Sequence, residues 1–251
     1  MPEDYFSTQA NAYQAFRPRY PQSLIDYLGT KLDKRATIVD CATGNGQAAI
    51  AFAGEQRRII GLDLSHSQLV NAPRHAGVSW VQSTVEQIPL NDRSADLIIV
   101  AQALHWFNFA AFYAEVRRIA TTNGFIAAWT YSLLAACDQF DDDIATVIRW
   151  FYHDVVGEYW PPERRWVDDE YQSIPYPFQD EPTPLFSIPI SWDKDALVGY
   201  VSSWSAVALY RRKLSRNPIP LFDEKLASIW PSASFKIQFQ WPLSLRFGAV
   251  H

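Results

Sequence analysis

The chain has 251 residues, 48% of them hydrophobic, which is enough apolar material for one sizeable core and predicts a single domain. Its formal net charge of −5 leaves no basic face that could neutralise nucleic-acid phosphates, so we expect no nucleic-acid binding. The acidic start and the lack of an apolar run of membrane-spanning length predict a cytoplasmic protein without a membrane partner.

The first predicted elements are two short helices in the aromatic-rich residues 5–28, separated by a proline turn at 17–21. We interpret residues 1–30 as an amino-terminal helical flap. From residue 36 to residue 130, which we interpret as the cofactor-binding core (36–130), apolar strand-like runs alternate with helical or turn segments. This is the βαβ rhythm of a parallel sheet. The predicted strands are residues 37–40, 58–63, 78–82, 96–101 and 125–129.

Two helix starts in this core carry residues whose side chains can accept a backbone hydrogen bond. Asn108 is predicted to cap a helix over residues 109–120, which Asn123 and Gly124 would end. Ser65 is predicted to cap the helix that follows the second strand.

After Trp129 the rhythm stops and the chain becomes rich in aromatic residues. Residues 131–233 are predicted to form a helical and aromatic substrate lid, with helices at 138–159 and 193–210 and one candidate strand at 186–192. Residues 234–251 alternate between apolar and polar side chains, and this pattern predicts two closing strands.

The two cysteines, Cys41 and Cys137, belong to no CxxC pair and to no His/Cys cluster with metal-ligand spacing. We therefore expect both to be reduced and buried. We also expect no structural metal.

Residues 37–50 predict a buried strand, a glycine turn and the start of a helix at Gln47. The strand ends at Asp40, and Gly44 and Gly46 allow the backbone to approach a ligand at the carboxyl end of the sheet. Asp63 ends the second strand, 23 residues beyond Asp40. Because the βαβ unit brings these two strands together, Asp63 can accept both hydroxyls of a ribose, so an adenosine-containing ligand is predicted.

Two cofactors fit this prediction. Residues 44–49 satisfy the GxGxx(G/A) pattern of dinucleotide-binding proteins, which makes a nicotinamide-dependent oxidoreductase a competing interpretation. However, Asp40 would repel a pyrophosphate and attract a cationic amino group. S-adenosylmethionine carries an ammonium and a sulfonium, so Asp40 favours it.

Four stretches, residues 39–46, 61–65, 85–90 and 101–107, together resemble the class I S-adenosylmethionine-dependent methyltransferases with a type 11 domain. Residues 13–21 and 159–165 are similar to the branch of trans-aconitate methyltransferases. The resemblance implies an α/β fold: a Rossmann-like three-layer sandwich with a mostly parallel seven-stranded sheet, an antiparallel carboxyl-terminal strand and a mainly helical lid.

The resemblance also implies roles for individual residues. The methionine end of the cofactor would be lined by Asp40, Gly44 and Gly46, and the ribose and adenine would be held by Asp63 and Leu64. The cofactor-binding residues implied in this way are Tyr13, Arg17, Asp40, Ala42, Gly44, Gly46, Asp63, Leu64, Thr84, Val85, Glu86, Gln102 and Trp106. Ala42 replaces the first glycine of the usual loop, and Thr84 stands where an aspartate is common. A requirement for positive φ at Ala42 would weaken cofactor binding.

The methyl acceptor is predicted to be a small molecule, with a carboxylate as one candidate, because an anion can attack the sulfonium methyl with little acid–base help. Candidate cations for holding it are Arg17, Arg164 and Arg165, since a guanidinium binds a carboxylate bidentately. The proline-stiffened aromatic segment suggests Tyr152 and Trp160 as further substrate candidates.

Several alternatives stay open from the sequence. His105 follows the fourth strand and is either a general base or a packing histidine, so no catalytic residue is assigned. A non-catalytic protein that binds S-adenosylmethionine is a further alternative, motivated by Ala42 and Thr84. The sequence is compatible with a monomer or a homodimer.

Overall fold

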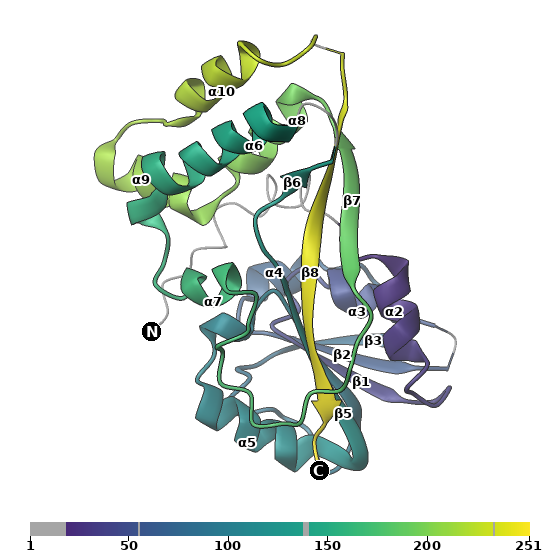
Figure 1. Cartoon of the computed structure of the whole chain (residues 1–251). Helices are drawn as coiled ribbons and strands as arrows, with labels where there is room; N and C mark the ends of the chain where they lie inside the picture. Colours follow the sequence, from purple (N-terminus) through teal and green to yellow (C-terminus); the bar gives the residue numbers. More distant parts are fainter. Residues whose placement is uncertain (1–18, 55, 138–140, 233) are drawn as a thin grey trace. The chain divides into compact units, whose positions relative to one another are not determined.

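The computed structural model describes residues 19–54, 56–137, 141–232 and 234–251 (Figure 1). These residues group into two compact units. The first, which we call the sheet unit, contains Arg19–Ser132, Arg165–Phe186 and Leu243–His251. The second, the helical unit, contains the described residues of Leu133–Arg164 and Ser187–Pro242. Residues 165–186, which the sequence analysis assigned to the lid, thus group with the sheet.

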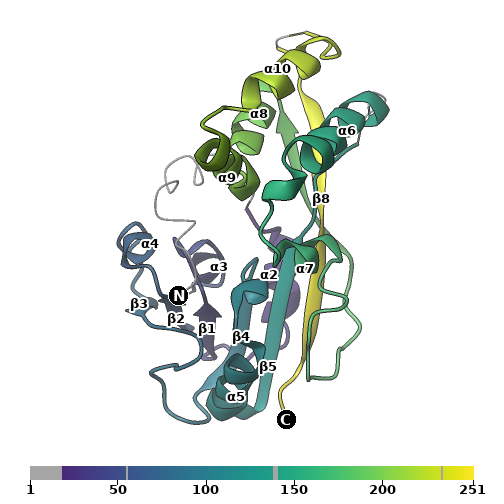
Figure 2. The same ribbon diagram turned by 90° about the vertical axis from the view of Figure 1, so that its left-hand side faces the viewer.

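The sheet unit is built on a mostly parallel sheet, as expected from the strand–helix rhythm. The strand order is β3, β2, β1, β4, β5 and then the carboxyl-terminal part of β8, and Figure 2 shows β1, β4, β5 and β8 side by side in that order. Neighbours from β3 to β5 are parallel, whereas β8 runs antiparallel to β5. The strands are β1 (Thr37–Cys41), β2 (Arg58–Asp63), β3 (Val78–Gln82), β4 (Ala95–Ala101), β5 (Ala120–Tyr131) and β8 (Ile237–Ala249). The order reverses between β1 and β4, and open α/β sheets bind ligands at such a point.

Helices cover both faces of this sheet: in Figure 1, β1 to β3 lie between α5 (Phe109–Ile119) on one side and α2 (Gln22–Gly29) and α3 (Gln47–Ala51) on the other. Short helices α4 (His66–Val70) and α7 (Arg164–Asp168) and a 3-10 turn at Leu104–Trp106 complete the connections. The core on the α5 side contains alternate strand residues, such as Val39 and Cys41 of β1, because successive side chains of a strand point to opposite faces. Asp40 therefore points to the α3 side.

The helical unit contains α6 (Asp141–Trp150), α8 (Lys194–Ser202), α9 (Ser205–Leu214) and α10 (Ile219–Ala227). A π-helical turn at Phe151–Val155 and a 3-10 turn at Gly157–Tyr159 follow α6. The short strand β6 (Ala135–Ala136) and β7 (Phe186–Trp192) pair with β8. With these two, the described residues form eight hydrogen-bonded strands, one more than the seven expected.

The structure confirms the parallel strands, the strand at 186–192 and the Asn108 cap, whose side chain accepts the Ala111 N–H at 3.3 Å. Ser65 stands at the predicted cap position, but its hydroxyl contacts Ser67 and makes no cap hydrogen bond.

Three boundaries were predicted wrongly. The helix expected at 193–210 is two helices, α8 and α9, separated at 203–204. The two closing strands are one continuous strand, β8. Pro242 does not interrupt it, because this residue, which has no N–H, falls between the residues paired with β6 and those paired with β5. Asn123 and Gly124 lie within β5 and do not end α5.

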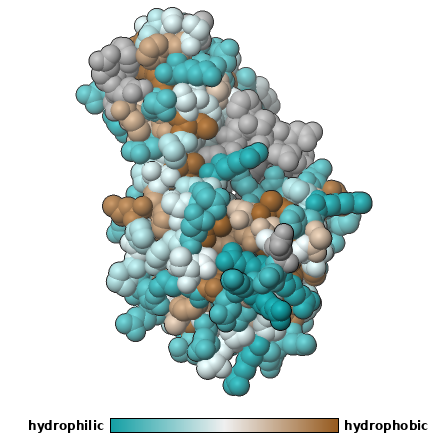
Figure 3. All heavy atoms as spheres, turned by 90° about the vertical axis from the view of Figure 1, so that its right-hand side faces the viewer, coloured by the Kyte–Doolittle hydropathy of each residue, from teal (hydrophilic) through white to brown (hydrophobic). Residues whose placement is uncertain are grey.

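Hydrophobic side chains alternate with hydrophilic ones on the face of the molecule shown in Figure 3. The large hydrophobic residues with the most exposure among those described are Leu64, Val70, Leu185, Leu214, Leu221 and Phe235. Within the same residues, no helix is both long enough and apolar enough to span a membrane.

Candidate cofactor site

The turn between β1 and α3 has the left-handed backbone that its glycines predict. Gly44 has φ 56° and Gly46, the residue before α3, has φ 82°. The Gly46 N–H donates to the Thr43 carbonyl at 2.9 Å, and the Thr43 N–H donates to the Leu62 carbonyl of β2 at 2.8 Å. The turn is thereby fixed to the end of the neighbouring strand.

Ala42 shares this left-handed backbone, with φ 56°. The position where the resemblance predicts glycine therefore does require positive φ. For a residue with a Cβ this conformation costs about 1–2 kcal/mol. Ala42 is half-buried, so the structure around the turn holds it in this strained conformation.

Asp40 lies at the end of β1 and is fully buried. Its Oδ2 accepts hydrogen bonds from the Thr43 hydroxyl and, at 3.0 Å, from the Ala49 N–H of α3. Within the described part of the chain, its Oδ1 has no hydrogen-bond partner. Burial raises the pKa of Asp40 to about 7, against the opposing effect of those two hydrogen bonds. A buried carboxylate with one unpaired oxygen fits the α-ammonium of S-adenosylmethionine.

Asp63 ends β2 and connects two turns. One oxygen accepts the Gly44 N–H at 2.7 Å and the other accepts the Ser65 N–H at 2.8 Å. These bonds place the carboxylate beside the glycine turn, where the resemblance expects the ribose. The next residue, Leu64, is 59% exposed and offers an apolar surface for a flat ring.

Trp80 of β3 was missed by the sequence analysis. Its indole lies so close to Gly46 and Gly61 that a Cβ on either glycine would stand 2.3 or 2.4 Å from a ring carbon. The indole N–H donates to the Pro73 carbonyl at 3.1 Å. A glycine inside a buried strand often marks such a close approach, so Gly61 was the available signal.

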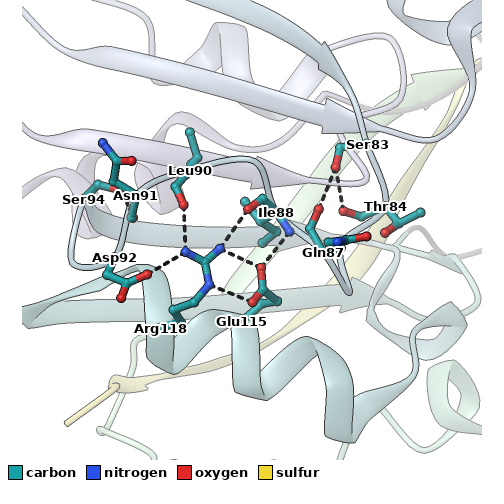
Figure 4. A network of polar contacts seen from close by, with 10 residues as sticks. All are labelled: Ser83, Thr84, Gln87, Ile88, Leu90, Asn91, Asp92, Ser94, Glu115 and Arg118. Atoms are coloured by element: carbon teal, nitrogen blue, oxygen red, sulfur yellow. Dashed lines mark hydrogen bonds and ion pairs between the residues drawn. The ribbon is translucent and has the colours of Figure 1, made fainter.

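The loop after β3 carries the three residues that the resemblance places near the adenine: Thr84 is exposed, Val85 is buried and Glu86 is half-buried. Glu86 Oε1 accepts the Asn108 N–H at 3.3 Å, which joins the loop to the start of α5. The Ser83 hydroxyl donates to the carbonyls of Thr84 and Gln87 at 2.9 and 3.0 Å and stabilises the turn itself (Figure 4).

Two charged residues of α5 bind the later part of the same loop, at Ile88 and Leu90 (Figure 4). Arg118 donates to the carbonyls of Ile88 and Leu90 at 2.8 and 2.7 Å, and Glu115 accepts the Ile88 N–H at 2.7 Å. The hydrogen bond from Arg118 lowers the pKa of Glu115. Both residues were missed, because only their spacing on one helix is visible in the sequence.

Gln102 follows β4 with a left-handed backbone, φ 57°. Its N–H donates to the Trp129 carbonyl of β5 at 2.8 Å. Its side-chain oxygen accepts the Thr130 hydroxyl at 2.8 Å and the Tyr131 N–H at 2.9 Å. The amide is therefore directed toward β5, while Trp106 lies half-buried in the following 3-10 turn.

His105 is buried, and its Nδ1 lies 2.8 Å from the hydroxyl of Tyr171. Burial raises the pKa of that hydroxyl. The ring of Trp106 covers the imidazole at a centroid distance of 4.9 Å. This geometry favours a packing role for His105 over a general-base role. Tyr171 was another residue that the sequence did not indicate.

Three of the four substrate candidates lie together in the helical unit. Arg164 donates from Nε to the Tyr152 hydroxyl at 2.7 Å, and its guanidinium lies 4.6 Å from the centre of a Trp160 ring. The Trp160 indole donates to the Tyr152 carbonyl at 3.2 Å. Arg165 is separate: it belongs to the sheet unit, is exposed and stacks on Trp166.

Two predicted cofactor residues, Tyr13 and Arg17, lie outside the described residues. The expectation for cysteine was correct for Cys41, which is buried, and wrong for Cys137, which is exposed because it follows the short strand β6. Within the described ranges, no cluster of three or more His, Cys, Asp or Glu side chains could hold a metal ion.

Comparisons with known proteins show the family of this chain. The methyltransferase domain family matches residues 39–128. A Dictyostelium discoideum protein named as a methyltransferase is 34% identical over 226 residues, 89% of this chain and 85% of that protein. A Saccharomyces cerevisiae protein named as an S-adenosylmethionine-dependent methyltransferase is 28% identical over 47% of this chain and 44% of its own length.

Among solved structures, a protein from Anaeromyxobacter dehalogenans described as a type II methyltransferase superimposes with a TM-score of 0.85. It is 34% identical, and the match covers 94% of this chain and 98% of that chain. These relatives are all named as methyltransferases, and none of the three is named as a nicotinamide-dependent oxidoreductase. The chain belongs to the class I S-adenosylmethionine-dependent methyltransferases with a Rossmann-like fold.

Proposed function

We propose that this enzyme transfers the methyl group of S-adenosylmethionine to a carboxylate of a small organic acid. The observation that carries the proposal is the cluster of Arg164, Tyr152 and Trp160 in the helical unit. The hydrogen bond to Tyr152 and the ring of Trp160 orient the guanidinium. An oriented guanidinium recognises a carboxylate with two parallel hydrogen bonds. The resemblance of residues 159–165 to trans-aconitate methyltransferases supports the same acceptor class.

Methyl transfer to a carboxylate needs no general acid or base. When bound, the cofactor supplies an electrophilic methyl group on a sulfonium. Asp40 and the glycine turn would hold its methionine end, and Asp63 with Leu64 would hold the ribose and adenine. Arg164 orients the acceptor, whose oxygen is already an anion. Positioning of this kind is worth about 7–11 kcal/mol in favourable cases. A packing role for His105 is compatible with this mechanism, because no proton has to be removed.

A panel of acids and their matched amides, alcohols and amines tests the proposal. Each compound is incubated with enzyme and cofactor, S-adenosylhomocysteine release is measured, and the methylated product is identified by mass spectrometry. We expect methyl esters from one or more acids and no product from their uncharged analogues. Methylation of an alcohol or amine without any ester would contradict the carboxylate assignment.

Arginine variants locate the acceptor. Arg164→Lys is expected to raise KM for the acid about tenfold or more, because an ammonium cannot reproduce the bidentate fork. Arg165→Lys is the matched control, since this neighbouring arginine is exposed and stacks on Trp166. Equal effects of the two changes would refute the role of Arg164.

A non-catalytic cofactor-binding protein is the second candidate, supported by the strained Ala42 and by Thr84 in place of an acidic residue. Saturable binding of the cofactor with no S-adenosylhomocysteine from any compound in the panel would favour it. The cytoplasmic location and the choice between monomer and homodimer stay predictions.

A further inference from the structure

Trp129 of β5 and Asp40 of β1 lie on the same face of the sheet. Asp40 pairs with Ile99 of β4, and Ile99 pairs with Ala127 of β5. Side chains in one paired row share a face, and residues two apart on a strand share it too. Trp129, two residues beyond Ala127, therefore projects from the same face as Asp40. It lies about 6.6 Å nearer the carboxyl ends of the strands.

Both side chains are fully buried, and each carries a polar atom without a partner in the described part of the chain: Trp129 Nε1 and Asp40 Oδ1. One is a donor and the other is an acceptor. A buried polar group without a hydrogen bond is costly, and native proteins keep few of them. Two such atoms of opposite character on one sheet face indicate a ligand that pairs with both.

Described neighbours of Trp129 fix the position of its side chain and of its backbone. The residue paired with it on β4 is Ala101, whose side chain is a single methyl group. The ring of Tyr20 packs against the indole edge-on at 5.3 Å, which fixes the plane of the indole. The carbonyl of Trp129 accepts the N–H of Gln102, so the residue is also fixed through its backbone.

We propose that the Trp129 indole N–H binds the α-carboxylate of S-adenosylmethionine while Asp40 pairs with its α-ammonium. The amino-acid moiety of the cofactor carries these two groups on one carbon. The α-carboxylate can accept a hydrogen bond from the Trp129 N–H, and the α-ammonium can pair with the carboxylate of Asp40. Trp129 lies outside the glycine turn and outside all the motifs that indicated the cofactor. It therefore extends the cofactor site from β1 and β2 to β5.

The test compares two ligands that differ only in the amino-acid moiety. Isothermal titration measures the affinity of S-adenosylhomocysteine and of 5′-methylthioadenosine, which lacks the α-carboxylate and the α-ammonium. Trp129→Phe keeps an aromatic ring and removes the N–H. We expect this variant to bind S-adenosylhomocysteine about tenfold or more weakly, as for a lost charge-assisted hydrogen bond, and to bind 5′-methylthioadenosine within about twofold of wild type.

Trp241→Phe is the matched control. Trp241 is also fully buried, but its N–H already bonds the Tyr200 hydroxyl at 3.2 Å within the helical unit. This variant should change neither affinity. Equal weakening of both ligands by Trp129→Phe, or no weakening of either, overturns the proposal; the second outcome would assign the N–H to a buried water.

The phenylalanine ring is smaller than the indole and could impair folding, so a second variant keeps the size of the side chain. Incorporation of 3-benzothienylalanine at position 129 replaces the N–H by sulfur and keeps the shape of the indole. The same selective loss of S-adenosylhomocysteine affinity is expected. Unchanged affinity in this isosteric protein overturns the assignment.

Discussion

Arg118 and Glu115 form a two-bond ion pair on α5: Nε lies 2.8 Å from Oε1, and Nη2 lies 2.7 Å from Oε2. The same two side chains bind the backbone of the loop after β3 at Ile88 and Leu90 (Figure 4). A third contact, from Arg118 to the exposed carboxylate of Asp92, is 2.8 Å long. The loop that carries Thr84, Val85 and Glu86 is thus held by a helix that does not itself contribute a predicted cofactor residue.

Arg118→Lys should loosen this loop, because a lysine cannot make the paired bonds to Glu115 and reach both carbonyls. We expect a loss of about 1–3 kcal/mol in the free energy of unfolding and a several-fold weaker affinity for S-adenosylhomocysteine. Urea unfolding and titration calorimetry measure the two effects. Arg117→Lys is the control: this neighbouring arginine of α5 donates to the carbonyls of Val250 and Pro177, which lie outside the loop. An affinity loss of the same size in that variant would show that the loop contacts are not the cause.

Ala42→Gly should stabilise the protein by about 0.5–1 kcal/mol, since it relieves the left-handed strain at φ 56° and loses part of that gain to the greater freedom of glycine in the unfolded chain. Affinity for the cofactor should stay the same or rise. The same change at Ala48, inside α3, is the control and should destabilise by about 1 kcal/mol. Chemical denaturation measures the free energy of unfolding of both variants, and destabilisation by both changes would rule out strain at Ala42.

Gly61→Ala should destabilise the protein by about 1–3 kcal/mol, because the new methyl group would meet the Trp80 ring at 2.4 Å. Replacing Trp80 by leucine in the same protein should recover part of the loss, and a double-mutant cycle measures this coupling. Gly54→Ala serves as the control. Apart from Gly54 and its two chain neighbours, no atom of the described residues lies within 4 Å of the new methyl group, and the φ of Gly54 is not in the left-handed region. Strictly additive effects at positions 61 and 80 would refute the contact.

The buried carboxyl of Asp40 predicts a pH dependence of cofactor binding. Its pKa in the folded protein is about 7, above the value of about 3.9 in an unfolded chain. Protonation therefore favours the folded protein without ligand, and stability falls as the pH rises from about 4 to 7. An ammonium requires the charged form, so affinity for S-adenosylhomocysteine should rise between about pH 6 and pH 8 and binding should release protons.

Calorimetry in buffers of different ionisation enthalpy measures this proton release. Asp40→Asn should abolish the pH dependence and the proton release together. Binding of 5′-methylthioadenosine, which has no ammonium, should show neither effect. A pH-dependent affinity that persists in the asparagine variant would place the titrating group elsewhere.

The sequence predicted what depends on local chemistry. The first four strands agree within one residue at each end, because runs of buried apolar residues ended by aspartate or by turn residues define them. The glycine turn, the start of α3 at Gln47 and the cap at Asn108 were also predicted, since each follows from the conformational preference of one residue.

The residues that the sequence did not indicate make their contacts with segments far away in the chain. Trp80, Arg118 and Tyr171 each contact segments distant in the chain, and no periodicity of their own segment indicates the partner. The left-handed backbone of Gln102 was missed for the same reason, because hydrogen bonds to β5 impose it on a residue that does not prefer it.

The antiparallel pairing of β5 with β8 has a consequence for how the protein folds. Phe125 pairs with Ala249 and Tyr131 pairs with Leu243, so the partner of β5 is synthesised long after β5 itself. Until then, β5 is an unprotected edge strand rich in apolar residues, and such edges template pairing with other chains. Completion of the sheet is a long-range and therefore slow event. Efficient production of this enzyme should depend on chaperones that shield β5 during translation.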